Sequence, residues 1–409
     1  MIDIRLARED PVALRRSLAR KGAAEQFDEL LRVDSAWRSL TAEVDELRSR
    51  TRPKGRPTPE ELAALQEVKE ALRAQEGQLG ELERRRDDLL ERIPNPPADD
   101  VPDGVSDEDA VELRRVGEPP VFGFEVRDHV ELGGFDLDRA AKLSGSRFAY
   151  RRGATALLEL AMYRYALDQL VRIGFEVLLP PVLVREEAMF GTGFLPTEEA
   201  NLYRLESDEL YLTGTSEVAL AGFHQGEILE TAELPSRYTG YSTCFRREAG
   251  AAGRDTRGIF RVHQFDKVEM FVYTTPEESA SEHERLLAIE EELVSALGLA
   301  YRVVCTAAGD LGPSAAKKYD IEAWIPSQGR YREITSCSNT TDYQARRLNI
   351  RYRDAARQLR VVHTLNGTAM TARWLIALVE TYQDAFGEVA VPEVLWAYGA
   401  PSRLPAAPR

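Results

Sequence analysis

Apolar residues recur in steps of three and four through residues 27–93, the pattern of helices that share an apolar seam. In the first half the seam positions are Leu30, Val33, Trp37, Leu40, Val44 and Leu47. In the second half they are Leu65, Val68, Leu72, Leu79, Leu82, Leu89 and Ile93, and Gln75 and Arg86 interrupt the series. Between the halves, residues 50–61 (RTRPKGRPTPEE) contain turn-forming Pro and Gly, and Thr58-Pro59 followed by Glu61 is a favourable helix start. The pattern predicts an antiparallel helical hairpin.

The pattern changes after this hairpin. Residues 94–110 are rich in Pro and Asp and predict a linker. Beyond it, a helix is expected over 154–173, a strand over 175–184 that ends at Pro180 and Pro181, and further helices over 276–297 and 369–386. This mixture predicts an α+β fold on an antiparallel sheet. We expect an N-terminal domain at 1–105, a second domain at 106–400 and, because it is rich in Pro and Ala, a disordered tail at 401–409.

Residues 239–271 predict a hairpin of two strands around a long loop rich in Gly, Arg and Asp. The outgoing strand carries Arg246 and Glu248 two residues apart, so both point to the same face. The returning strand repeats polar or aromatic residues with the same period, at Arg261, His263, Phe265, Lys267 and Glu269. Apolar residues are interleaved with them, at Phe245, Phe260, Val262, Val268 and Phe271. We therefore expect one packed face and one functional face.

Composition narrows the setting. The chain has 409 residues, 43% of them hydrophobic and 30% charged, which suits a globular protein of two or three domains. No apolar run approaches the roughly 20 residues of a transmembrane helix, and the N-terminus lacks the pattern of a secretory signal. The three cysteines are isolated, which predicts no zinc site and a reducing, cytoplasmic location.

A formal net charge of −15 argues against a general nucleic-acid binder, so an RNA partner would have to meet a local basic patch. The tip of the helical hairpin offers one, formed by Arg48, Arg50, Arg52, Lys54 and Arg56. Arg84, Arg85 and Arg86 form a second basic cluster on the returning helix. The alternative to a phosphate-binding surface is a solvated loop tip.

Seven motifs in the chain closely resemble those of the seryl-tRNA synthetases, members of the class II aminoacyl-tRNA synthetases. They are YLTGTSE (211–217), FRREAG (245–250), GRDTRG (253–258), RVHQFDKVEM (261–270), YREITSCSN (331–339), DYQARR (342–347) and HTLNGT (363–368). The resemblance implies an N-terminal coiled-coil arm and a catalytic domain on an antiparallel sheet flanked by helices. It implies ATP-dependent activation of L-serine to seryl-adenylate, with Mg²⁺ as a further cofactor, and transfer of the seryl group to tRNA(Ser). It also implies that the arm binds tRNA and that the helix and strand at 154–184 form a homodimer interface.

The resemblance assigns roles to individual residues. Arg246 and Arg373 would be catalytic, and arginine suits this chemistry because its planar guanidinium binds phosphate and carboxylate in fixed geometry. The ATP-binding residues would be Arg246, Glu248, Arg261, Phe265, Glu333, Ser336 and Arg373. Of these, Glu333 and Ser336 would hold Mg²⁺, and Phe265 would stack on adenine.

A second set would bind serine: Thr215, Glu217, Arg246, Glu269, Asn366 and Thr368. Thr215 and Glu217 would face the ammonium group, and Glu269 and Thr368 the hydroxyl. A buried polar pair that alanine leaves unsatisfied rejects alanine strongly, so a serine site of this kind needs no editing. His263 is expected to be structural, since adenylation does not require it.

The chain departs from the usual pattern of the family at three places. The hairpin is one to two heptads shorter than in bacterial members, and Asn339-Thr340-Thr341 replaces a more usual Asn-Cys-Thr/Asp. The segment NGTAMTAR (366–373) is one residue shorter before Arg373, which would turn a following helix by about 100° unless the loop absorbs it. These departures raise the hypothesis of a divergent second copy, serving a specialised pathway or tolerant of a serine-mimicking inhibitor. Two alternatives stay open: the same adenylation with a carrier protein or small molecule as acceptor, and a non-catalytic synthetase-like adaptor.

Overall fold

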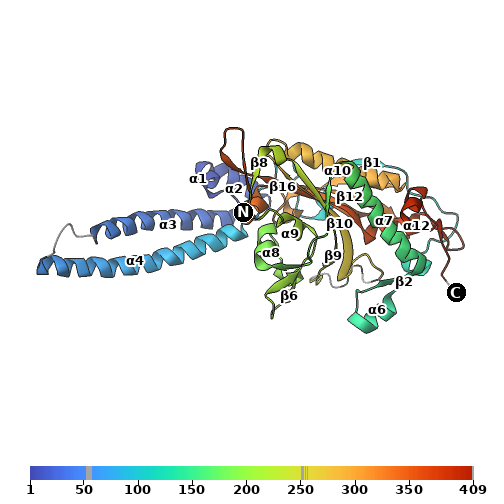
Figure 1. Cartoon of the computed structure of the whole chain (residues 1–409), viewed down its shortest axis with the longest axis horizontal. Coiled ribbons are helices and arrows are strands. Elements are labelled where there is room, and N and C mark those ends of the chain that lie inside the picture. Colours follow the sequence, from blue (N-terminus) through green and yellow to red (C-terminus); the bar gives the residue numbers. More distant parts are fainter. Residues whose placement is uncertain (52–57, 250–252, 254, 256, 408–409) are drawn as a thin grey trace. The chain divides into compact units, whose positions relative to one another are not determined.

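The computed structural model describes residues 1–51, 58–249, 253, 255 and 257–407, and the side chain of Glu61 is outside this set (Figure 1). The chain divides into two compact units, Met1–Pro96 and Pro97–Arg409. Among the described residues, no helix is long and apolar enough to cross a membrane.

The N-terminal unit is helical, and its helical hairpin confirms the prediction from the seam pattern. Its helices are α1 (Ile4–Glu9), α2 (Pro11–Ala19), α3 (Ala24–Arg50) and α4 (Pro59–Arg92). Phe27, Leu30 and Ile93 are fully buried where the base of the hairpin packs on the first two helices. The two interruptions of the seam are accommodated by polar contacts, since Gln75 donates to Glu43 (3.4 Å) and the Arg86 guanidinium lies 4.1 Å from the centre of the Trp37 ring.

The second unit is built on an eight-stranded sheet in the order β1-β11-β12-β13-β16-β10-β9-β4. Neighbouring strands are antiparallel except β4 and β9, which are parallel. The strands are β1 (Val111–Val116), β11 (Tyr301–Cys305), β12 (Lys317–Ile325), β13 (Arg330–Thr341), β16 (His363–Thr371), β10 (Gln264–Thr274), β9 (Ser236–Phe245) and β4 (Glu176–Leu178). This arrangement confirms the predicted α+β fold. The hairpin over 239–271 is also present, but its strands are shorter than predicted: Arg246 and Glu248 follow the end of β9, and Arg261 and His263 precede the start of β10.

Smaller sheets and helices complete the unit. The small sheets are β5-β7-β6 (Leu183–Arg185, Leu210–Leu212, Tyr203–Leu205), β15-β14-β8 (Leu359–Val361, Arg351–Arg353, Ile228–Glu230), β2-β3 (Phe135–Asp136, Tyr150–Arg151) and β17-β18 (Val389–Ala390, Arg403–Leu404). The α-helices are α5 (His129–Leu132), α6 (Leu137–Ser144), α7 (Gly153–Arg172), α8 (Glu186–Thr192), α9 (Glu217–Ala221), α10 (Ser279–Ala296), α11 (Tyr343–Leu348) and α12 (Ala372–Thr381). Short 3₁₀ helices lie at Asp107–Asp109, Glu199–Asn201, Thr231–Glu233, Ala308–Asp310, Pro326–Gln328 and Glu393–Tyr398.

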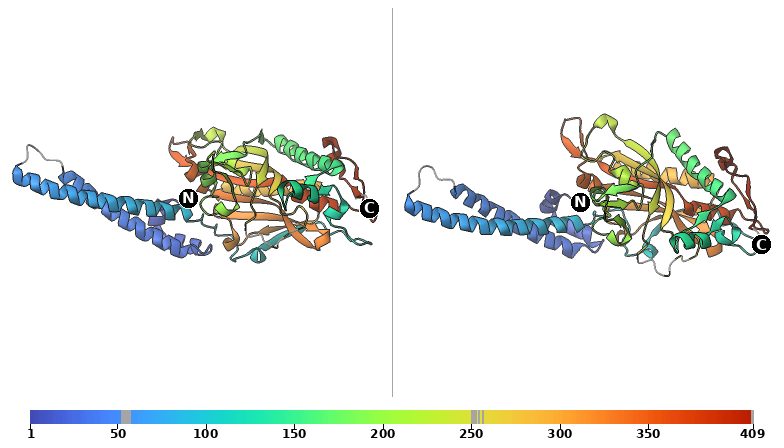
Figure 2. Two further views of the ribbon diagram at one scale, coloured as in Figure 1. Left: turned by 90° about the horizontal axis from the view of Figure 1, so that it is seen from below. Right: turned by 60° about the horizontal axis from the view of Figure 1, so that its bottom comes forward.

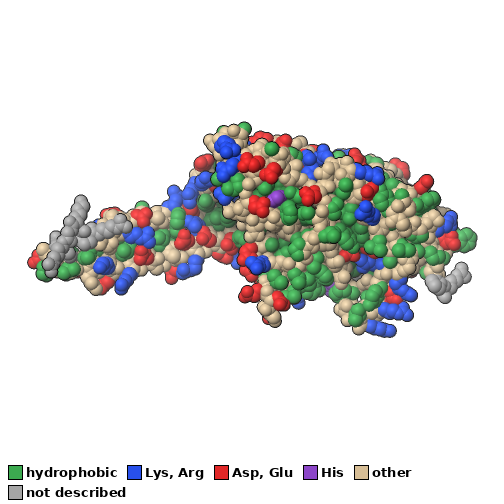
Figure 3. Space-filling view, in the orientation of Figure 1, with side chains coloured by type: hydrophobic (Ala, Val, Ile, Leu, Met, Phe, Trp, Pro, Cys, Tyr) green, Lys and Arg blue, Asp and Glu red, His purple; other side chains and the backbone are tan. Residues whose placement is uncertain are grey.

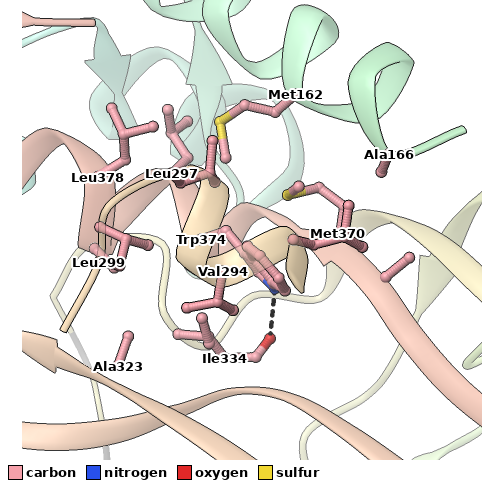
Figure 4. Packing of buried hydrophobic residues seen from close by; sticks show 14 of the residues in the cluster. Met162, Ala166, Val294, Leu297, Leu299, Ala323, Ile334, Met370, Trp374 and Leu378 are labelled. Atoms are coloured by element: carbon pink, nitrogen blue, oxygen red, sulfur yellow. Dashed lines mark hydrogen bonds between the residues drawn. The ribbon is translucent and has the colours of Figure 1, made fainter. Parts of the chain in front are cut away.

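The two faces of the central sheet differ, as the alternation along 261–271 predicts. On one face Val268, Met270 and Val272 are fully buried against α7, α10 and α12. The green α7 runs along the outside of the sheet in both views of Figure 2. Trp374 of α12 is fully buried in this core, where its indole N–H donates to the carbonyl of Ile334 (3.1 Å; Figure 4). On the other face, Phe271 and Tyr273 pack in a second cluster, and the earlier residues of β10 line a cavity.

Four expectations need correction. Residues 97–110 are not a free linker, because Val101 packs on Ala308 and Leu311 and the Ala98 N–H donates to the carbonyl of Ala316. Residues 175–184 do not form one strand, because Pro180 and Pro181 interrupt it and β4 and β5 join different sheets.

The prediction of a disordered tail at 401–409 is wrong for residues 401–407, and residues 408–409 lie outside the described residues. Arg403–Leu404 pairs with Val389–Ala390, and Leu404 is only 5% exposed. A single buried leucine in a Pro- and Ala-rich segment is too weak a signal to detect from composition. The expected helix over 369–386 is also shorter, because Ala369–Thr371 belong to β16 and α12 ends at Thr381.

Candidate active site

A cavity of about 510 Å³ opens on the polar face of the central sheet. Every residue predicted to bind ATP or serine lines it: Thr215, Glu217, Arg246, Glu248, Arg261, Phe265, Glu269, Glu333, Ser336, Asn366, Thr368 and Arg373. These residues come from the turn before α9, the β9–β10 hairpin, β13, β16 and the start of α12. Segments as distant in sequence as Thr215 and Arg373 therefore meet at one site.

Three arginines line the cavity, and each is held in place by the protein. Arg246 donates its Nε to the carbonyl of Gly214 (2.9 Å), and its guanidinium lies 5.4 Å from the centre of the Phe265 ring. Arg261 forms an ion pair with Glu248 (2.6 Å), and Arg373 contacts the Glu333 carboxylate at 3.3 Å. Fixed guanidinium groups that converge on one cavity are suited to binding a polyanion such as a triphosphate.

Asn201 holds the backbone of Glu248, a function that the sequence did not reveal. Glu248 has a positive φ of 52°, which is costly for a residue other than glycine. On either side of it, the N–H of Arg247 donates to the Asn201 carbonyl (2.9 Å) and the N–H of Ala249 donates to the Asn201 side-chain Oδ1 (3.0 Å). Asn201 also lines the cavity. No pattern links it to Glu248, because the two residues belong to separate elements.

The lining of the cavity also includes a buried cluster of charges. Lys267 forms an ion pair with Glu269 and donates to the Thr215 hydroxyl (2.5 Å), and its side chain is only 8% exposed. Glu269 pairs across the strands with Thr368 of β16, so the two groups expected to hold a hydroxyl are neighbours. Lys267 was not among the predicted site residues, although its period-two spacing between Phe265 and Glu269 was a usable signal.

Glu217 lies beside this cluster and is oriented by two amides. Gln344 and Asn366 donate to the same oxygen, Oε1, at 2.7 and 2.9 Å. Burial, together with the negative charge of Glu269, raises the pKa of Glu217 to about 7. Burial also raises the pKa of Glu269 above its usual range, although Lys267 opposes this. A substrate ammonium bound beside Glu217 would supply a positive charge that favours the ionised form of this carboxylate.

Glu333 and Ser336 both line the cavity, although they are three residues apart on β13. The register of β12 and β13 shifts between Ile321 and Glu322, which leaves Ile334 as the extra residue of a β-bulge. The bulge puts residues three apart on one face. The same device acts on β16, where Ala369 is the extra residue and Thr368 and Thr371 both reach the cavity.

The donor set at Glu333 suits a hard cation. Burial would raise its pKa, but the positive charges of Lys318, Arg373 and Arg246 lower the pKa of Glu333 to about 2, so it is ionised. Within the described residues, no group of three or more His, Cys, Asp or Glu side chains could hold a metal by itself. A carboxylate and a hydroxyl are a fitting partial shell for Mg²⁺, which prefers to complete its coordination with phosphate oxygens and water.

Two further predictions concern single residues. His263 does not line the cavity; its Nδ1 lies 2.9 Å from the Arg246 carbonyl and its ring packs near Phe148, which fits the expected structural role. At the strand–helix junction before Arg373, Thr371 caps α12 by accepting from the Arg373 N–H (3.3 Å). Arg373 thereby reaches the cavity while Trp374 packs into the core.

The predicted RNA-binding residues are only partly described. Arg52, Lys54 and Arg56 lie outside the described residues. Arg50 is exposed at the end of α3, and Arg48 is already paired with Glu76 of α4 (2.9 Å) and with Asp45 (3.3 Å). Basic and acidic side chains alternate along the hairpin in Figure 3.

The sequence matches two family models. Residues 1–97 match the seryl-tRNA synthetase N-terminal domain, and residues 202–382 match the tRNA synthetase class II core domain (G, H, P, S and T). The serine–tRNA ligase of Leifsonia xyli subsp. xyli is 51% identical, with 97% of both chains covered.

Two solved structures of serine–tRNA ligases are also similar to this chain. The seryl-tRNA synthetase from Pyrococcus horikoshii complexed with ATP is 41% identical and superposes with a TM-score of 0.93, covering 100% of each chain. The cytoplasmic serine–tRNA ligase from Naegleria fowleri in complex with AMP is 34% identical, with a TM-score of 0.89 and 99% of each chain covered.

Proposed function

Because the chain belongs to the seryl-tRNA synthetases of class II, we propose how its own residues carry out the activity of that family. The protein is an ATP-dependent serine–tRNA ligase. A serine carboxylate oxygen attacks the α-phosphorus of ATP and pyrophosphate leaves. The 3′-terminal adenosine hydroxyl of tRNA(Ser) then attacks the carbonyl carbon of seryl-adenylate, and AMP leaves.

One observation carries the assignment of the residues. The arginine side of the cavity is continuous with a buried cluster of Thr215, Lys267, Glu269 and Thr368, so a polyanion and a small hydroxyl-bearing amino acid would meet there. The positive charge of Arg246 favours the ionised form of Glu269 in this cluster and also that of Glu333, so Arg246 is near both and would neutralise the attacking carboxylate and the α-phosphate. Catalysis by fixed charges of this kind needs positioning more than a general base.

The remaining nucleotide contacts are those that the family resemblance implies, and all of these residues line the cavity. Glu248 would accept from the adenine amino group, Phe265 would stack on the ring, and Arg261 and Arg373 would bind the distal phosphates. Glu333 and Ser336 would hold Mg²⁺, whose charge, when it is bound, offsets that of the phosphates. The residues around Glu217 and Glu269 would bind the ammonium and hydroxyl groups of serine.

The N-terminal unit, Met1–Pro96, would bind tRNA(Ser) through the hairpin, with Arg48 and Arg50 among its contacts, and it is shorter than the domain of 1–105 expected from the sequence. The three cysteines are free and buried, which supports a reducing cytoplasm as the location.

We also propose a homodimer. On α7, Leu157 and Leu160 are 54% and 57% exposed, and on the adjacent edge strand Val177 is 40% exposed. Exposed apolar residues on neighbouring elements are typical of a subunit interface. Sedimentation at micromolar concentration would test it, and a monomer would refute it.

Serine-dependent ATP–pyrophosphate exchange, with alanine, threonine and cysteine as controls, tests the assignment, and total tRNA is then added. Exchange with serine followed by stable aminoacyl-tRNA is expected. Exchange without charging would favour another acceptor, and an absence of exchange with every amino acid would favour the adaptor.

A further inference from the structure

His129, at the start of α5, joins two parts of the molecule that were assigned no common role. It is 5% exposed and does not line the cavity. Its Nδ1 lies 2.9 Å from Oε1 of Glu380 on α12, and its Nε2 lies 3.1 Å from the backbone nitrogen of Ile259, on the returning arm of the β9–β10 loop.

The hydrogen-bond pattern defines the state of the ring. Glu380 is fully buried and its carboxylate accepts from the backbone N–H groups of His129 (3.0 Å) and Ser327 (3.1 Å). The imidazole Nδ1 therefore donates to Glu380, and the unprotonated Nε2 accepts from Ile259. A neutral imidazole of this tautomer satisfies both neighbours, whereas a ring protonated on both nitrogens would present a donor to the Ile259 N–H.

The hydrogen bond from Ile259 to His129 lies next to residues that are expected to bind ATP. Ile259 and Phe260 both line the cavity. The ring of Phe260 lies 4.8 Å from the Arg373 guanidinium and 3.8 Å from that of Arg332. Displacement of Phe260 would therefore release the face against which Arg373 rests.

The surrounding contacts leave the loop arm little freedom. Arg257 forms an ion pair with Asp128 (2.9 Å) and a hydrogen-bonded ion pair with Glu131 (3.2 Å), on either side of His129 in sequence. Gly258 has a φ of 79°, and a Cβ added to it would lie 2.2 Å from the His129 Nε2. The backbone thus passes so close to the imidazole that only glycine fits there.

We propose that His129 is a positioning residue for ATP: it ties the returning arm of the β9–β10 loop to Glu380 of α12, and so sets Phe260 against Arg373. This proposal rests on the function proposed above. It predicts that loss of the Nε2 acceptor impairs the use of ATP and spares the binding of serine, because Phe260 packs against Arg373 and Arg332, whereas the serine cluster is formed by Thr215, Lys267, Glu269 and Thr368.

Two matched variants separate the two bonds. In His129→Gln the side-chain oxygen can reach the position of Nε2 and keep the bond to Ile259, whereas the shorter His129→Asn can reach only Glu380. In pyrophosphate exchange, His129→Asn should lower kcat/KM for ATP by about 10- to 100-fold, since it leaves a buried N–H unsatisfied, with KM for serine unchanged. His129→Gln keeps the bond to Ile259 but loses the one to Glu380, so its loss in kcat/KM for ATP should be smaller than that of His129→Asn, with KM for serine unchanged. Wild-type kinetics in His129→Asn, or equal losses for ATP and serine in both variants, would overturn the proposal.

Hydrogen exchange of the Ile259 amide tests the bond without relying on activity or on variants. In the intact wild-type protein this amide should be strongly protected, and ATP should add little. Rapid exchange in the wild type would refute the proposal even if His129→Asn failed to fold. If the amide were protected but no amino acid supported pyrophosphate exchange, the proposed function would fail while the positioning contact stood.

Discussion

The helical hairpin and the cavity both carry many charged side chains, but the two regions use them in different ways. On the hairpin, Arg48 and its partner Glu76 are 53% and 40% exposed, and water screens their interaction. In the cavity, Lys267 and Glu269 are 8% and 1% exposed, and each charge depends on the other. Single substitutions should therefore have large effects in the cavity and small, additive effects on the hairpin.

The largest effect should come from Arg246→Ala. It removes the guanidinium that stands between the expected carboxylate and α-phosphate, so serine-dependent pyrophosphate exchange should fall about 10³-fold. Arg247→Ala is a matched control, because that guanidinium lies over the Tyr203 ring (5.4 Å) and does not line the cavity. Similar losses of exchange activity in the two variants would mean that an arginine in the cavity contributes no more to activity than one outside it.

Glu269→Gln should have the next largest effect. It should lower kcat/KM for serine about 10²-fold, because it leaves Lys267 buried without a counter-charge. The preference for serine over alanine should narrow at the same time. Exchange rates with the two amino acids give the ratio, and thermal unfolding separates impaired recognition from impaired folding. An unchanged ratio would show that Glu269 does not select the hydroxyl.

The pH dependence of serine binding should follow Glu217. Its pKa is raised to about 7, and only the ionised carboxylate attracts an ammonium group. Below pH 7 the protonated form dominates, so KM for serine should rise by up to about 10-fold per pH unit, and above pH 7 it should level off. In Glu217→Gln the KM should be higher and this dependence on pH should disappear. A flat profile in the wild type would show that Glu217 is already ionised.

The smallest effect should come from Arg48→Gln on the hairpin. Because Arg48 is exposed and already paired with Glu76, charging of tRNA should weaken only about 2-fold, and pyrophosphate exchange without tRNA should not change. The salt dependence of tRNA binding should become shallower by about one released ion for each phosphate that the variant no longer neutralises. A loss of activity as large as that in Arg246→Ala would erase the contrast between the two regions.

Local sequence patterns were sufficient to predict many elements of this molecule and many residues of its cavity. The heptad seam predicted the helical hairpin, and the two-residue period of 261–271 predicted a strand with one packed and one polar face. The motifs also identified residues that line the cavity, because the spacing between the residues of a motif can be read from a short stretch of sequence. The same reasoning missed Asn201 and His129, which act on the β9–β10 loop from other elements through backbone N–H groups, and no local spacing records such contacts.

The sequence by itself therefore determined the elements, the two kinds of unit and the family, since these depend on periodicity and on side-chain chemistry along short stretches. Only the tertiary structure decided which side chains share a face where a β-bulge breaks the alternation of a strand. The bulges at Ile334 and Ala369 turn Glu333 with Ser336, and Thr368 with Thr371, toward the same cavity against the strict alternation of a strand. It also decided the state of Glu217, because the pKa of a carboxyl depends on its burial and on charges such as that of Glu269, which folding brings from another strand.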